Sequence, residues 1–150
     1  MEDTRLALVV LIPLLGSIAS YLFGRVAPKL AGVIASVVVG ISFLNVLSLW
    51  QGLEGGNTFS FTLSSWLSFA DVRLPLEVYF DKLSAVMCLV VTGVGFLIHV
   101  YSIGYMAEDE SRPRFFSYLN LFIFSMLILV LGKSLPVVFI GWEGVGLASY

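Results

Sequence analysis

The stretch from Leu83 to Tyr105, LSAVMCLVVTGVGFLIHVYSIGY, is 23 residues long and contains no Asp, Glu, Lys or Arg. An α-helix rises about 1.5 Å per residue, so about 20 apolar residues cross the roughly 30 Å hydrocarbon core of a bilayer. The stretch therefore predicts a transmembrane helix. Four further stretches have the same character, and only the last of them contains a charge, Glu143: residues 6–23, 30–50, 115–132 and 134–150.

The composition agrees with an integral membrane protein. Hydrophobic residues make up 59% of the 150 residues and charged residues 12%, against roughly 45–50% and about 25% in ordinary globular proteins. This balance excludes a disordered chain, a nucleic-acid binder and a disulfide scaffold. The net charge of −2 and the single cysteine, Cys88, imply neither a polyanionic partner nor an internal disulfide. We predict an all-α membrane protein with five transmembrane helices, and residues 1–150 as one membrane region.

The connections between these helices are residues 24–29, 51–82, 106–114 and Lys133 alone. Asp81, Ser111 and Ser134 precede helices and are of the residue types that cap helix N-termini. The basic residues number four on each side of the membrane, so the positive-inside rule decides little. The density of basic residues in 24–29 favours a cytoplasmic position for that loop and an N-terminus on the outside.

The 32-residue connection contains two runs in which apolar and polar residues alternate. These runs, 58–63 and 72–80, are separated by residues 64–71 and preceded by Gly55-Gly56-Asn57. Alternation with a period of two predicts a β-hairpin at about 58–80 with one apolar face. Pro75 confines the second strand to a sheet edge or a bulge. The apolar face has two interpretations: packing on the protein's own helix ends, or docking onto a neighbouring subunit.

Glu143 lies nine residues after Ser134, about 13–14 Å along the predicted helix and near the bilayer midplane. A carboxylate at that depth costs a few kcal/mol or more, so it must face protein or trapped water and either pair with a cation or hold a proton. Gly141 and Gly144 beside it permit close approach of another helix. Proton exchange is one role; a structural interhelical bond is the alternative. Because Lys133 lies at the membrane surface, the partner cation must come from another segment or chain.

His99 lies six residues before the end of its segment, near the interface on the side of Arg112 and Arg114. We expect its ring to bond to backbone or water, with proton entry as the alternative role. Asn45 and Asn120 predict interhelical hydrogen bonds or water ligands. The sequence has no nucleotide-binding loop, metal cluster or nucleophile triad, so we expect no enzymatic chemistry within this chain.

Three blocks resemble the large antiporter-like subunit of respiratory complex I, called chain L in bacteria and chain 5 in mitochondria. They are TGVGFLIHVY (92–101), RFFSYLNLF (114–122) and GWEGVGLASY (141–150). The resemblance implies a proton-translocating membrane subunit of an NADH:quinone oxidoreductase. It implies a glutamate at Glu143 that works with a lysine on a later, broken helix. His99 falls within the first block and stays a weaker proton-site candidate.

The resemblance also implies the cofactors, partners and location. FMN, iron–sulfur clusters, NADH and quinone would be bound by other subunits, with no cofactor, metal or nucleic acid in this chain. The partners would be other membrane subunits, an adjacent antiporter-like subunit contacted through the hairpin, and the lipid of a bacterial cytoplasmic membrane. Since the last stretch stops at Tyr150 without a polar flank, we expect the chain to be the N-terminal portion of a larger helix bundle.

Two other functions fit the same residues. A cation/proton antiporter, a membrane-bound hydrogenase or a photosynthetic complex I-like assembly would use a similar channel subunit with a different soluble arm. A purely structural five-helix module, with Glu143 as a packing residue, is the alternative of another class.

Overall fold

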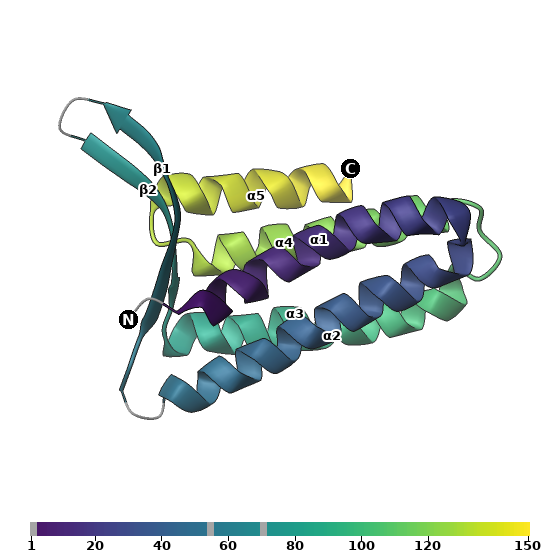
Figure 1. The fold of residues 1–150 in the computed structure, drawn as a ribbon, viewed down its shortest axis with the longest axis horizontal. Coiled ribbons are helices and arrows are strands. Elements are labelled where there is room, and N and C mark those ends of the chain that lie inside the picture. Colours follow the sequence, from purple (N-terminus) through teal and green to yellow (C-terminus); the bar gives the residue numbers. More distant parts are fainter. Residues whose placement is uncertain (1–2, 54–55, 70–71) are drawn as a thin grey trace.

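The computed structural model describes residues 3–53, 56–69 and 72–150 of the chain. Five helices and one two-stranded antiparallel sheet follow one another, with the hairpin between the second and third helices (Figure 1). The elements are α1 Thr4–Val26, α2 Pro28–Leu53, β1 Phe59–Phe69, β2 Val72–Phe80, α3 Lys82–Tyr105, α4 Arg112–Leu131 and α5 Leu135–Ser149. The predicted fold class is therefore confirmed.

Four helices in the described part of the chain, α1 to α4, are long and apolar enough to cross a membrane. Less than half of each apolar span is buried inside the protein, and large side chains such as Leu15 and Leu97 are more than 60% exposed. An apolar outer surface of this extent suits a lipid solvent, since soluble monomers rarely expose large apolar patches. α5 forms where the fifth span was predicted but has 15 residues, about 22 Å at 1.5 Å per residue. By length alone it falls short of the roughly 30 Å core.

The helices extend beyond the uncharged stretches, and the predicted first connection, residues 24–29, is wrong in extent. α1 continues to Val26 and α2 begins at Pro28, so Ala27 alone lies between them. Gly24 permits this tight corner: a Cβ there would lie 2.8 Å from Pro113 and 2.9 Å from Ala31. Charged residues at helix ends reach water at the membrane surface and need not end the helix.

The hairpin is longer than the alternation predicted. β1 continues through residues 64–69, which were expected to link the strands, and pairs in register from Phe59 opposite Phe80 to Phe69 opposite Val72. The register shifts at Leu63 and Trp66 are β-bulges, each adding one residue to β1. A bulge interrupts the alternation of apolar and polar residues, so the sequence pattern predicted no strand beyond Leu63. Gly55 and residues 70–71 lie outside the described residues.

The base of the hairpin packs on the protein's own helix ends. Phe59, Val78 and Phe80 are almost fully buried in the same apolar core as residues of α1 to α4. β2 also joins the α4–α5 turn, through a bridge between Val78 and Gly132. The first interpretation of the apolar face is therefore correct for this part. The far end of the hairpin extends past α5 and away from the bundle (Figure 1).

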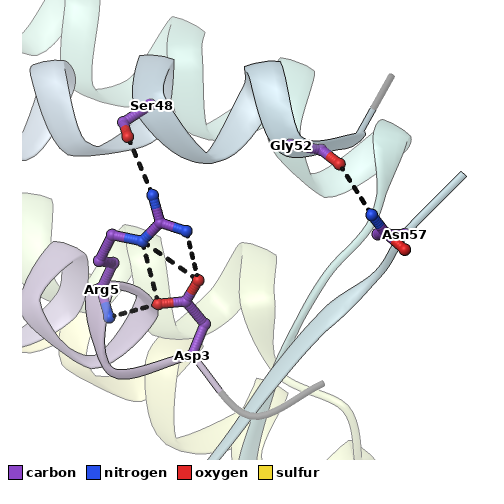
Figure 2. Close-up of polar contacts among 5 residues, drawn as sticks. All are labelled: Asp3, Arg5, Ser48, Gly52 and Asn57. Carbon is purple, nitrogen blue, oxygen red and sulfur yellow. Dashed lines mark hydrogen bonds and ion pairs between the residues drawn. The ribbon is translucent and has the colours of Figure 1, made fainter. Parts of the chain in front are cut away.

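The N-terminus, the hairpin and the α4–α5 turn lie at one end of the bundle, and the α1–α2 and α3–α4 connections lie at the other (Figure 1). At the hairpin end, Asp3 caps α1 by accepting from the Arg5 backbone N–H at 2.8 Å, and the Arg5 guanidinium lowers the pKa of Asp3. Figure 2 shows the same guanidinium reaching the Ser48 hydroxyl of α2 at 3.2 Å. One arginine thus ties the start of α1 to the end of α2.

Of the three predicted caps, one forms in full. The Asp81 carboxylate accepts from Ser84 N–H at 2.8 Å and the Ser84 hydroxyl accepts from Asp81 N–H at 2.8 Å, a reciprocal capping box. Ser111 and Ser134 occupy the N-cap positions of α4 and α5, but neither side chain makes a capping bond. Asp109 accepts from the Ser111 backbone N–H at 2.6 Å, a turn that precedes the helix and caps none of its first-turn N–H groups.

The Asp81 cap supplies a prediction. Asp81→Ala should destabilise α3 by about 0.5–2 kcal/mol, whereas Ser111→Ala should change stability by less than about 0.5 kcal/mol. The Ser84 backbone N–H lowers the pKa of Asp81, so the capping stability is present above the unfolded pKa of about 3.9 and is lost as pH falls through the lower native value. Thermal unfolding of the purified protein at pH 7 and pH 3 measures both effects. Equal effects of the two substitutions at pH 7 would contradict the capping box.

The arrangement of the connections supplies a second prediction. Asn57 and Asp109 are exposed at opposite ends of the bundle, so single cysteines at these positions in a Cys88→Ala background should react with impermeant reagents from opposite sides of the membrane. The density of basic residues predicts that Asp109 faces the cytoplasm. Labelling of both positions from one side would refute the topology.

Candidate functional site

α5 holds Glu143 on a helix that packs tightly against α4. Its first turn follows directly on the hairpin-bound turn at Gly132 to Ser134, and Pro136 is tolerated because first-turn N–H groups lack intrahelical acceptors. A Cβ at Gly141 would lie 2.4 Å from the backbone nitrogen of Leu129, and one at Gly144 would lie 2.5 Å from the Ser125 hydroxyl. The two glycines therefore permit backbone-to-backbone contact with α4, as small residues do in membrane helix pairs.

Glu143 is exposed on α5, as are Trp142 and Leu147. The glycines predicted to give another helix access to the carboxylate instead face α4. Within residues 3–53, 56–69 and 72–150, nothing forms a hydrogen bond or ion pair with the Glu143 carboxylate. A structural bond to another helix of this region is thus unsupported.

Lys133 is the cation nearest to Glu143 in the sequence, and it is engaged elsewhere. Its ammonium lies 2.6 Å from the Glu77 carboxylate, and its backbone N–H donates to the Glu77 carbonyl at 3.1 Å. This contact fixes the α4–α5 turn to β2 at the end of the bundle. Lys133 is therefore kept away from the middle of α5, in agreement with its predicted surface position.

His99 is fully buried on α3. Its Nδ1 lies 2.7 Å from the Gly95 carbonyl oxygen, a backbone bond of the expected kind, and its ring lies 6.5 Å from the Phe116 ring of α4. α4 covers the ring, so the side chain is buried within the protein. Its position six residues before the end of α3 is the predicted one. Glu143 and His99 are not brought together: α5 packs on α4, which separates it from α3 (Figure 1).

Neither asparagine makes an interhelical hydrogen bond within the described residues, and the alternative of a water ligand stays a prediction. Asn45 Nδ2 donates to the Ile41 carbonyl at 3.0 Å and Asn120 Nδ2 to the Phe116 carbonyl at 3.4 Å, both within their own helices. A buried interhelical bond that the sequence did not identify is made by Ser17 of α1, whose hydroxyl donates to the Ser117 carbonyl of α4 at 2.8 Å. Its only signal was the recurrence of small residues along α1.

No group of three or more His, Cys, Asp or Glu side chains that could hold a metal occurs among the described residues. An iron–sulfur cluster requires several cysteine thiolates, and the chain has one cysteine. The residues present therefore do not fit such a cluster. What the arrangement offers is a single carboxylate on the open face of an apolar helix, which can exchange a proton with a partner brought to that face.

Solved structures share this fold. A chain of the archaeal membrane-bound sulfane sulfur reductase, a respiratory membrane complex, matches with a TM-score of 0.79 at 19% identity, covering 97% of this chain and 22% of that one. A chain of the Mrp complex from a Dietzia species matches with a TM-score of 0.77 at 25% identity, covering 96% and 15%. The fold is that of an antiporter-like membrane subunit.

Sequence relatives agree with the resemblance noted in the sequence. A family profile described as NADH-ubiquinone oxidoreductase (complex I), chain 5 N-terminus, matches residues 66–116. NADH-quinone oxidoreductase subunit L of Escherichia coli is 40% identical over 97% of this chain, and NADH-ubiquinone oxidoreductase chain 5 of Metridium senile is 42% identical over 95%. The chain is similar to subunit L and chain 5 over nearly its whole length, in agreement with the resemblance of the three sequence blocks. It spans about a quarter of the length of these relatives, 24% in both cases.

The packing of α5 supplies a third prediction. Gly141→Ala should push α5 off α4, because the new Cβ would meet the Leu129 backbone and not a movable side chain; overpacking of this kind costs about 1–3 kcal/mol. Gly146 is the matched control, since a Cβ there meets nothing within 4 Å among the described residues. Thermal unfolding of the two variants should show a lower midpoint for Gly141→Ala alone. Equal midpoints would mean that the α4–α5 contact is not tight.

Proposed function

We propose that this chain is the part of a proton-translocating membrane subunit of an NADH:quinone oxidoreductase in which Glu143 takes up and releases protons. The observation that supports this most is the Glu143 carboxylate itself, the one Asp or Glu side chain of the α5 segment, set on a helix whose other side is closed against α4 by Gly141 and Gly144. Homology to subunit L and chain 5 supports the assignment to complex I.

Burial in hydrocarbon disfavours the carboxylate, and a nearby cation favours it. A carboxyl group held between these opposing effects changes protonation when the cation moves or loses its own proton. Because Lys133 is bound to Glu77, the cation must reach α5 from another segment or another subunit. A lysine on a broken helix, as the family resemblance implies, would supply it.

The remaining parts of the proposal concern partners and location. FMN and iron–sulfur clusters, NADH and quinone belong to other subunits, so this chain contributes proton transfer and no redox step. The far end of the hairpin, which extends past α5, is proposed to contact the adjacent antiporter-like subunit. The apolar surface of α1 to α4 supports a multi-pass protein, which we assign to the bacterial cytoplasmic membrane.

A second function has specific support. The Mrp and sulfane sulfur reductase chains share the fold over nearly all of this chain, and an antiporter-like subunit can serve assemblies with different soluble arms. In such an assembly Glu143 would keep its proton-exchanging role. Loss of NADH oxidation coupled to quinone reduction when the gene is deleted would distinguish complex I from these relatives.

The test is Glu143→Gln in the assembled complex. Glutamine keeps the size and hydrogen-bonding capacity of the side chain but cannot ionise, so assembly should be normal while proton uptake falls by roughly ten-fold or more. Glu143→Asp shortens the side chain by one methylene and retains a titratable group, so its effect should be milder. Redox turnover and proton uptake in sealed vesicles measure both variants. Near-normal proton uptake in Glu143→Gln would assign the residue to packing.

A further inference from the structure

Two buried acceptor atoms on facing helices have no hydrogen-bond donor among the described residues. They are Nε2 of His99 on α3 and Oδ1 of Asn120 on α4, and both residues are 0% exposed. An unpaired buried polar group costs roughly 1–3 kcal/mol, so such atoms generally have a partner, either protein or ordered water. Two such groups on adjacent helices suggest one shared partner.

The packing of α3 on α4 places the two atoms on the same contact surface. Gly95 of α3 meets Ile123 of α4, since a Cβ at Gly95 would lie 2.6 Å from the Ile123 side chain. One turn along, the His99 ring meets the Phe116 ring at 6.5 Å. Asn120 lies between Phe116 and Ile123 on the same face of α4, because residues three and four apart are neighbours on a helix. The His99 ring meets the Phe116 ring and the Asn120 amide donates to the Phe116 carbonyl, so both residues lie beside Phe116 near the α3–α4 contact.

The hydrogen bonds that His99 and Asn120 make determine which of their atoms are left without a partner, and that both of these atoms are acceptors. The Gly95 carbonyl oxygen can only accept, so His99 Nδ1 carries the proton in the 2.7 Å contact and a neutral ring presents Nε2 as an acceptor. Asn120 Nδ2 donates to the Phe116 carbonyl, which leaves Oδ1, also an acceptor, as the free end of the amide. Two acceptors cannot bond each other, whereas a water molecule has two protons and can donate to both.

We propose that His99 Nε2 and Asn120 Oδ1 form a buried water-binding site between α3 and α4, and that this water carries protons into the subunit from the end of the bundle where α3 and α4 are joined. The second part rests on the proposed proton-translocating function. The site lies about 9 Å inside α3, counted from Tyr105 at about 1.5 Å per residue. A proton that reaches this water passes on to Nε2 and leaves a neutral water molecule behind. The imidazolium N–H then donates to that water, which donates in turn to Asn120 Oδ1, until the proton leaves.

The surroundings of the imidazole are uncharged in the described contacts. α2 packs on α3 through Gly32 against Ile103 and Gly40 against Phe96, and α4 contributes Phe116, Asn120 and Ile123. The charged side chains nearest along α4 are Arg112 and Arg114 at its start, and Arg112 Nε donates to the Met106 carbonyl. With no carboxylate facing the ring among these contacts, the positive charge is a transient state of the site.

High-resolution cryo-electron microscopy of the assembled complex tests the site. We expect an ordered water within hydrogen-bond distance of both Nε2 and Oδ1, and its loss in Asn120→Leu, which keeps the approximate size of the side chain but removes the acceptor. Thr92→Val is the matched control: Thr92 is equally buried on α3, and its hydroxyl donates to the Cys88 carbonyl of its own helix at 2.7 Å. A dry contact, or a protein donor to either atom, would overturn the site.

Proton uptake in vesicles tests the role of the water. Asn120→Leu should lower the rate by roughly ten-fold or more, Asn120→Asp should retain uptake because an acceptor oxygen stays in place, and Thr92→Val should be close to the parent. Normal uptake in Asn120→Leu would overturn the proton-carrying role even if the water is present. The Glu143→Gln result does not depend on these variants, so failure of this inference and failure of the proposed function can be distinguished.

Discussion

The structure depends on one constraint: inside hydrocarbon, every polar group must find its hydrogen bond within the protein. The helices satisfy their own backbone, and most polar side chains within them turn back to the same backbone. Ser36 donates to Gly32 and Thr92 to Cys88, each four residues earlier. Such bonds remove the cost of a buried hydroxyl without linking helices. The few polar groups that do not bond in this way, His99 Nε2 and Asn120 Oδ1 among them, are therefore the informative ones.

Association of the helices follows from close packing, since lipid offers them no hydrophobic driving force. α4 is the central helix: α1, α2, α3 and α5 all contact it. Gly141 and Gly144 bring α5 against it, and Gly95 lets α3 approach Ile123. Because α4 separates α3 from α5, the His99 and Glu143 regions lie on opposite sides of one helix. A proton passing from one to the other would have to go around or along α4, through groups beyond these two.

The hairpin links this packing to the ends of the helices. Its base belongs to the bundle core through Phe59, Val78 and Phe80, and β2 is joined to the α4–α5 turn by Glu77 and Lys133. The same strand therefore fixes the turn from which α5 begins.

The sequence by itself determined the membrane class, the five helical segments and the hairpin. Each of these features depends on the composition or the periodicity of one continuous stretch. A long uncharged stretch forms a helix in lipid, and alternation of apolar and polar residues matches the two faces of a strand. The Asp81 cap was predictable for the same reason, since a capping box is local. The bulges at Leu63 and Trp66 were not, because a bulge exists only relative to the partner strand. Tertiary structure alone decided that Gly141 faces α4 while Glu143 faces outward, and that the rings of His99 and Phe116 meet. Those contacts join residues far apart in the chain, and helix packing, which no local pattern encodes, selects the face each helix presents.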